Sequence, residues 1–414
     1  MKKIRFHLLS FAQLHIALTG LFLFLLFAAN CIPQERIWAN AEHSIHLLAE
    51  RPGSLQEQSL LELFSPNTED STFYRSLRGM GSSADWGGAQ ILLRPLLYLF
   101  QIEQIHALCS LVFFLLFFAA AYTVGKRLSF PCGLLFAGAI LWSDVLSVST
   151  IPQQAGCYFI AFCAILALPW GRQPVWNGYD IPLSRSFYVI GAWTAFESGI
   201  SGLPYIGSSG IPAITLGLPA AACFTYYCAH KPDKGLSALW RFAFHIVSAW
   251  FSGYLLMLAT KWLVSGIAFG INPGSIALDA ARQWLIVSPQ HIFPALWGNI
   301  RAYLSHAGYG LPVLAFLFAV STAAFLLLYL KGHKQDPWRS LLAAIPLLFI
   351  GITPYLVSLA LPGSIVLDTG ISLRQQAAAA FPALMALVRL LDMDSLSKCL
   401  QGSSRYASRK EDDA

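Results

Sequence analysis

Long apolar runs separated by short polar connectors recur along almost the whole chain. A membrane span needs roughly 20 apolar residues to cross a hydrocarbon core about 30 Å thick. Candidate spans stand at 8–30, 105–125, 129–147, 154–170, 187–203, 209–229, 242–265, 309–330, 341–361 and 375–391. The pattern predicts an all-α polytopic membrane protein of about ten transmembrane helices.

The first of these runs has two interpretations. A basic head at residues 1–5 precedes it, and a basic head before an apolar stretch occurs both in cleaved signal peptides and in uncleaved first helices. The run is long, and residues 29–31, Ala-Asn-Cys, make a weak cleavage site. We therefore expect an uncleaved first transmembrane helix.

The longest interruption of the apolar pattern lies between the first and second spans. Ile37, Ile45 and Leu48 recur near helical spacing within 34–50, which predicts an amphipathic helix. The polar stretch 65–70 has the composition of a turn. Residues 89–100 are apolar but too short to span a membrane, so they indicate a helix that lies at the membrane interface.

This pattern divides the chain into four parts. Residues 1–31 are the first transmembrane helix, and 32–104 are an outer loop of amphipathic helices. Residues 105–391 form a multi-helix transmembrane domain, and 392–414 form a cytoplasmic tail.

The composition agrees with a membrane protein, and the charges suggest how the chain is oriented. Hydrophobic residues make up 56% of the chain and charged residues 12%, whereas soluble domains average about 25% charged. With the amino terminus inside, 18 of the 27 Lys and Arg residues fall on the inner side, as the positive-inside rule requires. We expect a multi-pass membrane protein with both termini in the cytoplasm. The net charge of +6 is then a topology signal, and no nucleic-acid partner is indicated.

Four charged residues stand inside or beside predicted spans, where lipid makes charge costly. They are Arg94, Glu197, Lys261 and Arg374. Arg94 and Lys261 could equally be interfacial anchors, since long basic side chains reach the interface easily. Glu197 has no such long stem, so we expect it to face a polar pocket near the outer leaflet.

The cysteines and histidines do not indicate a metal site or a disulfide framework. Most of the eight cysteines lie within apolar spans, where cysteine behaves as a small hydrophobe. The histidines lack the spacing of metal ligands. The sequence therefore identifies no cofactor and leaves the need for a divalent metal open.

Short motifs spread along the chain give it a resemblance to a known group of proteins. They are Ile32-Pro33, Asn67-Thr68-Glu69-Asp70, Leu93-Arg94-Pro95, Phe196-Glu197, Thr215-Leu216-Gly217-Leu218-Pro219, Gly253-Tyr254, Lys261-Trp262, Pro354-Tyr355 and Leu373-Arg374. The chain resembles uncharacterised bacterial polytopic membrane proteins of surface-polysaccharide loci. These are related in layout to GT-C-type glycosyltransferases, which use lipid-linked sugars.

The resemblance implies an enzyme that moves a sugar from a polyprenyl-phosphate donor to a glycan or lipid acceptor outside the membrane. In such enzymes an acidic residue of the first outer loop is the general base. Asp70 matches that place, and Glu69 is the second choice. The resemblance further implies that Arg94, Lys261 and Arg374 bind the donor phosphate, while Glu197 orients a sugar hydroxyl.

Two other functions stay open at this stage. A transporter or flippase of lipid-linked glycans would use the same outer polar cavity, although such folds often carry inverted repeats and the sequence shows none. A non-catalytic subunit of a polysaccharide assembly complex is the third. It is supported by residues 362–364, Pro-Gly-Ser, which stand where the group carries a histidine.

Overall fold

The computed structural model of the chain describes residues 2–49, 61, 64, 71–78, 86–143, 152–170, 181–197, 212–230, 236–270, 344–351 and 377–391. Within these ranges all regular secondary structure is helical. The prediction of an all-α fold is therefore confirmed for the described part of the chain.

The helices follow the apolar runs of the sequence closely. Their bounds are α1 (Lys2–Asn30), α2 (Gln34–Ala49), α4 (Thr72–Arg78), α5 (Gln90–Leu99), α6 (Ile102–Arg127), α7 (Phe130–Leu141), α9 (Pro152–Ala167), α10 (Ile181–Glu197), α11 (Pro212–His230), α12 (Leu236–Phe269) and α19 (Ala377–Leu391). Residues 344–351 add a short helical segment.

Three of these helices are long and apolar enough to cross a membrane. They comprise residues 10–30 of α1, all of α6 and all of α12, which suggests a multi-pass membrane protein. Several shorter apolar helices accompany them, among them α7, α9, α11 and α19. The predicted span 309–330 lies outside the described residues, so the total of about ten spans stays a prediction.

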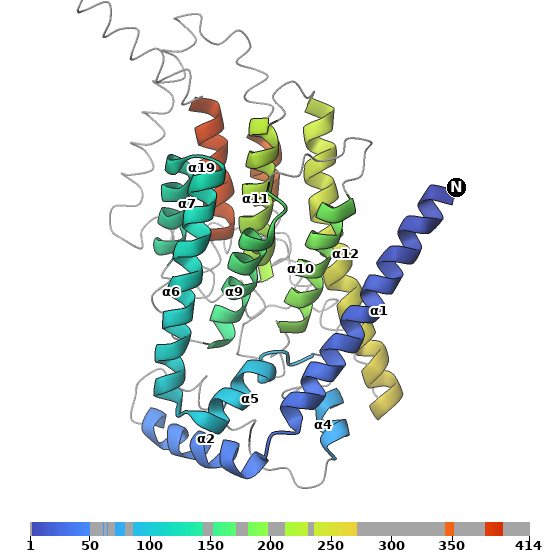
Figure 1. The fold of residues 1–414 in the computed structure, drawn as a ribbon, viewed down its shortest axis with the longest axis vertical. Helices are drawn as coiled ribbons and strands as arrows, with labels where there is room; N and C mark the ends of the chain where they lie inside the picture. Colours follow the sequence, from blue (N-terminus) through green and yellow to red (C-terminus); the bar gives the residue numbers. More distant parts are fainter. Residues whose placement is uncertain are drawn as a thin grey trace, which may run out of the picture.

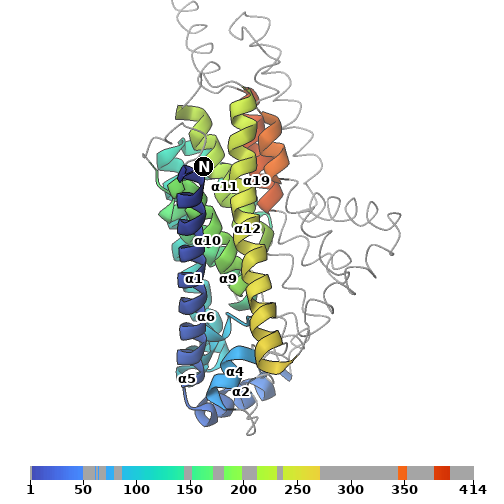
Figure 2. The same ribbon diagram turned by 90° about the vertical axis from the view of Figure 1, so that its right-hand side faces the viewer.

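The helices form one elongated bundle with an additional layer at one end (Figures 1 and 2). In Figure 1, α6, α7, α9, α10, α11, α12 and α19 run roughly along the long axis, while α1 leans across the side of α10 and α12. Helices α2, α4 and α5 lie at the end where α1 and α12 finish and α6 begins. We call this layer of three helices the cap.

The cap has a hydrophobic core of its own. Ile37 and Ala41 of α2 pack with Leu93 and Leu97 of α5 and with the start of α6. The side chain of Asn40 donates a hydrogen bond of 2.7 Å to the backbone oxygen of Leu97, which ties α2 to α5. The predicted helices at 34–50 and 89–100 are thus confirmed as α2 and α5. Helix α4 was not predicted, because seven residues are too few for a clear hydrophobic period.

Among the described helices, α10 and α12 pack most closely. A Cβ atom placed on Gly191 of α10 would lie 2.0 Å from the backbone oxygen of Trp250, and one on Gly253 of α12 would lie 2.1 Å from that of Tyr188. Small residues at a crossing allow helix backbones to approach this closely. The crossing therefore fixes the position of α10, which carries much of the candidate site.

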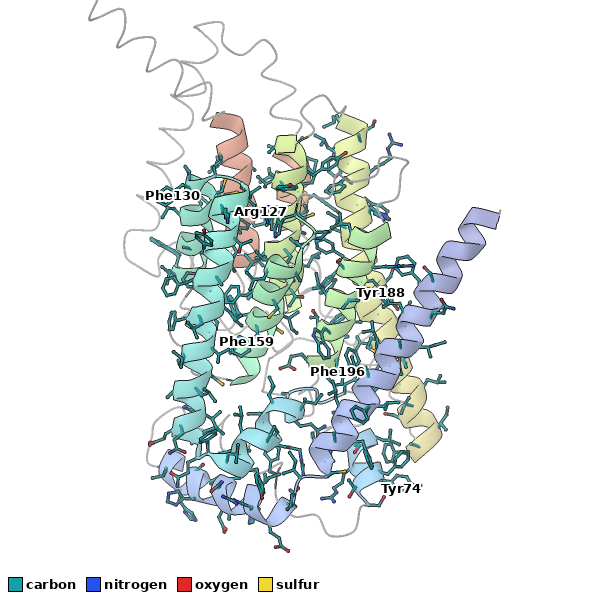
Figure 3. All side chains as sticks on the ribbon, in the orientation of Figure 1. Tyr74, Arg127, Phe130, Phe159, Tyr188 and Phe196 are labelled. Atoms are coloured by element: carbon teal, nitrogen blue, oxygen red, sulfur yellow. The ribbon has the colours of Figure 1, made fainter. Side chains whose placement is uncertain are left out.

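Hydrogen bonds between side chains also connect the helices. The ring of His15 on α1 lies 2.8 Å from the Thr260 hydroxyl of α12 and 2.8 Å from the Tyr188 hydroxyl of α10. Figure 3 shows Tyr188 on the side of α10 that faces α1. On α10, Thr194 donates a hydrogen bond of 2.7 Å to Thr215 of α11. Polar contacts of this kind hold helices together where water is absent.

Candidate functional site

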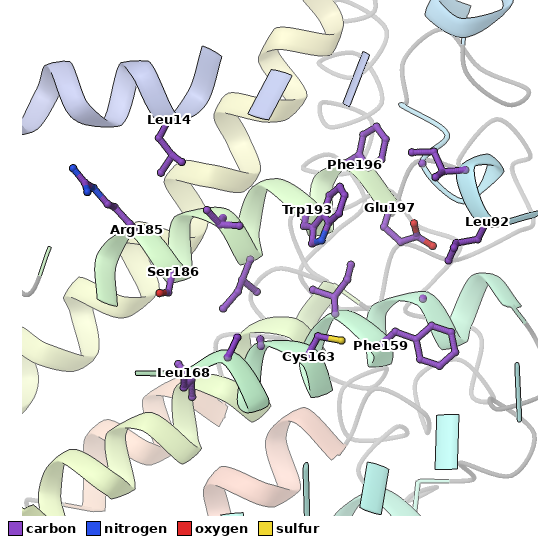
Figure 4. Close-up of a pocket in the computed structure, with 18 residues that line it drawn as sticks. Leu14, Leu92, Phe159, Cys163, Leu168, Arg185, Ser186, Trp193, Phe196 and Glu197 are labelled. Atoms are coloured by element: carbon purple, nitrogen blue, oxygen red, sulfur yellow. The ribbon is translucent and has the colours of Figure 1, made fainter. Parts of the chain in front are cut away.

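A cavity of about 580 Å³ lies between α9 and α10, with walls completed by α1 and α5 (Figure 4). Most of the side chains that line it are apolar. Among the described residues that line it, only Glu197 and Arg185 carry charge. The close-up shows them at opposite ends of the cavity. They stand twelve residues apart on α10, which corresponds to about 18 Å along a helix axis. The cavity is thus a long apolar groove with a carboxylate at one end.

Glu197 lies at the end of the cavity that is next to the cap. It is the last residue of α10, and its carboxylate packs against Gly156 near the start of α9. A Cβ atom on Gly156 would lie 2.2 Å from Oε1 of Glu197, so only glycine leaves room for the carboxylate in this position. Glu197 is partly buried, and the described residues provide no hydrogen-bond partner for its carboxylate.

The end of α10 is held in place by the segment that leads into α5. The backbone N–H of Gly88 donates a hydrogen bond of 3.0 Å to the backbone oxygen of Phe196. A Cβ atom on Gly88 would lie 2.5 Å from that oxygen, so this contact also requires glycine. The cap therefore closes the cavity next to Glu197.

Stacked aromatic rings form one wall of the cavity. Phe22 of α1 stacks on Trp193 and on Phe196 of α10, with ring centres 4.6 and 4.0 Å apart. Trp86 lies beside Phe196, with ring centres 5.9 Å apart. Trp193 and Phe196 line the cavity, whereas Trp86 and Phe22 do not. These four rings, which we call the aromatic wall, separate the cavity from the side chains behind Trp86.

Lys261 lies behind this wall. Its side chain is fully buried. The ammonium group donates a hydrogen bond to the backbone oxygen of Leu77 at the end of α4, and Nζ lies 5.6 Å from the centre of the Trp86 ring. The Trp86 indole N–H in turn donates a hydrogen bond of 2.9 Å to the backbone oxygen of Met257. Lys261 therefore connects α12 to the cap. The interpretation of Lys261 as an interfacial anchor is wrong, because a snorkelling side chain would extend into water.

Arg94 is also buried, and it connects three helices. Its Nε donates a hydrogen bond of 2.9 Å to the backbone oxygen of Ala29 at the end of α1, and a second donor nitrogen contacts the side-chain oxygen of Gln34 on α2. Burial, with a smaller contribution from the positive charge of Arg75, lowers the pKa of the Arg94 guanidinium to about 10. Arg94 is therefore still charged at neutral pH and ties α5 to α1 and α2.

The three predicted site residues that the structure describes do not converge on one pocket. Glu197 lines the cavity, but Lys261 and Arg94 do not, and each of the three has different neighbours. Glu69, Asp70 and Arg374 lie outside the described residues, so their place near the cavity stays a prediction. The described part of the chain holds no group of three or more His, Cys, Asp or Glu side chains suited to a metal ion.

The sequence did not single out two features of the cavity. Gly156 is one glycine among 31, and no local pattern shows that it faces Glu197, which is 41 positions away. Arg185 is one of 27 Lys and Arg residues, and its sequence context does not indicate a site. In the structure it lies at the far end of the groove, where a guanidinium nitrogen donates a hydrogen bond of 2.7 Å to the Ser10 hydroxyl of α1.

Known proteins give no further constraint on this site. Comparisons of the chain with protein-family models, with characterised proteins and with solved structures return no match.

Proposed function

We propose that the protein is a membrane glycosyltransferase with a GT-C-like arrangement. It moves a sugar from a polyprenyl-phosphate donor to a cell-surface glycan or lipid acceptor on the outer side of a bacterial inner membrane. The observation that carries the proposal is the long apolar cavity between α9 and α10 with a carboxylate at its cap end. An enzyme that acts on lipid-linked substrates needs space for a hydrocarbon chain beside a polar reaction site, and this cavity offers both.

The proposed reaction exchanges one bond at the anomeric carbon of the sugar for another. The acceptor hydroxyl loses its proton to a carboxylate as its oxygen bonds to the anomeric carbon, and the bond from that carbon to the donor phosphate breaks. Polyprenyl phosphate leaves with the electron pair. Positive charge fixed near the phosphate stabilises the leaving group. Asp70 is our choice for the base, with Glu69 second. Arg374 is our choice for the positive charge, because Lys261, another predicted cation, is buried and contacts the carbonyl oxygen of Leu77.

Direct measurement of transfer tests the proposal. The protein is reconstituted in liposomes with polyprenyl-phosphate hexoses labelled in the sugar, and envelope extract supplies acceptors. We expect label to move from the donor to an acceptor and Asp70→Asn to lower the rate at least about 100-fold, because general-base catalysis contributes about 10²–10⁴-fold. Glu57→Gln removes another carboxylate of the same loop and should leave the rate unchanged.

Two outcomes would count against the proposal. Near-normal transfer by Asp70→Asn would remove the base from the mechanism. Movement of labelled lipid across the liposome membrane without transfer of the sugar would instead identify a transporter.

A further inference from the structure

The charges around the cavity restrict what it can bind. Glu197 faces the cap end, and the positive charge among the lining residues, Arg185, lies at the opposite end. The chain segments joined directly to this end of α9 and α10, residues 144–151 and 198–211, contain Asp144 but no Lys or Arg. A phosphate placed beside Glu197 would thus meet a carboxylate without a neighbouring cation from these segments.

Two buried cations at the cap end of the bundle, Lys261 of α12 and Arg94 of α5, have other partners. Lys261 lies behind the aromatic wall and contacts the carbonyl oxygen of Leu77, and Arg94 contacts Ala29 and Gln34. Neither lines the cavity. Because like charges repel strongly where water is scarce, an anionic head group is unfavourable at this end of the cavity.

The remaining surface of the cavity suits a hydrocarbon chain. Phe159 and Ile160 of α9 line it together with Val189 and Trp193 of α10. Cys163 lines the cavity and is exposed, so the groove is open to the surroundings of the bundle at that point. Ligand pockets typically combine such apolar walls with very few polar groups that fix the orientation of the ligand.

We infer that this cavity binds a lipid that bears a free hydroxyl, with the hydroxyl donating a hydrogen bond to Glu197 and the hydrocarbon chain extending toward Arg185. In the proposed transfer reaction this lipid is the acceptor. Glu197 positions its hydroxyl before the reaction, the hydroxyl then turns its proton to Asp70 as its oxygen bonds to the sugar, and the donor phosphate lies outside the cavity. Only the assignment as acceptor rests on the proposed function. The binding preference follows from the cavity itself.

Photo-crosslinking tests the inference with two probes that differ only in the head group. Hexadecanol and hexadecyl phosphate, each with a diazirine in the chain, are added to the full-length protein in detergent, and labelled peptides are quantified by mass spectrometry. Labelling of residues 159–163 and 189–193 reports binding in the cavity. It is divided by labelling of residues 111–118, because the exposed apolar side chains of α6 report non-specific contact with each probe. We expect the alcohol to give at least a tenfold higher ratio than the phosphate.

Three variants assign the signal to the cavity. Cys163→Trp fills the groove from an exposed position and should remove the enrichment, whereas Leu115→Trp makes a comparable change on the exposed face of α6 and should not. Glu197→Gln keeps the size and a hydrogen-bond acceptor but removes the charge, so the preference for the alcohol should fall toward one. Equal or stronger labelling by the phosphate probe in the unmodified protein would overturn the inference, as would unchanged enrichment in Cys163→Trp.

The two hypotheses fail separately in these experiments. If the alcohol is preferred but no sugar transfer occurs, the binding site stands and the proposed function is wrong. If sugar transfer occurs but the phosphate probe is preferred, the proposed function stands and the inferred binding preference is wrong. The cavity is then the donor site.

Discussion

Gly191→Ala tests the close crossing of α10 and α12, on which the shape of the cavity depends. The new Cβ atom would lie 2.0 Å from the backbone oxygen of Trp250, whereas ordinary van der Waals contact begins at 3.4 Å. The two backbones would have to separate by about 1.4 Å, because the obstructing atom belongs to a helix and cannot rotate away. Since Gly253 approaches α10 just as closely, the separation would loosen both halves of the crossing.

The expected cost follows from two opposing effects. Overpacking of a well-packed core costs typically about 1–3 kcal/mol and occasionally more, and a 1.4 Å obstruction by backbone belongs at the upper end of that range. Replacing Gly by Ala in a helix gains about 1 kcal/mol. We therefore expect Gly191→Ala to lower the free energy of unfolding by about 2 kcal/mol.

The measurement is unfolding of the purified protein in mixed detergent micelles, followed by circular dichroism at increasing fractions of SDS. Gly138→Ala is the matched control, because no atom lies within 4 Å of a Cβ at Gly138, and it should be neutral or stabilising by up to about 1 kcal/mol. If Gly191→Ala proved as stable as Gly138→Ala, the crossing would not be as close as the structure indicates.

Three further predictions follow from other contacts. Gly156→Ala should leave the free energy of unfolding nearly unchanged, because the new Cβ would displace only the flexible side chain of Glu197. The displaced carboxylate should no longer give a preference for the alcohol probe, and an unchanged preference would contradict this. Lys261→Ala should make the backbone amides of α4 exchange hydrogen about tenfold faster. The variant leaves the buried carbonyl of Leu77 without its donor, which costs about 1–3 kcal/mol, and about 1.4 kcal/mol corresponds to a tenfold change in an equilibrium constant. Equal exchange in both proteins would mean that the cap does not depend on this contact. For topology, reporter tags should place Lys126 in the cytoplasm and Gly53 outside; tags on the same side would refute the assigned orientation.

Much of the fold could be predicted because membrane helices are encoded locally. The apolar runs alone located α1, α6 and α12, and the helical period of Ile37 and Ile45 located α2. Hydropathy is a property of neighbouring residues, so it identifies a helix without reference to the rest of the molecule. The exact ends were less predictable. The run predicted at 187–203 corresponds to α10, which begins at Ile181, because packing against α12 extends the helix beyond its most apolar part.

The candidate site depended on contacts that the sequence does not encode locally. Sequence alone identified Glu197 as unusual, because a carboxylate in an apolar run is costly wherever it faces lipid. Only the tertiary structure showed that Gly156 makes room for its carboxylate, that Arg185 lies at the opposite end of the same groove, and that Lys261 lies behind the aromatic wall. The physical reason is that hydrophobicity and charge are carried by single residues, whereas a cavity arises from the way separate helices pack.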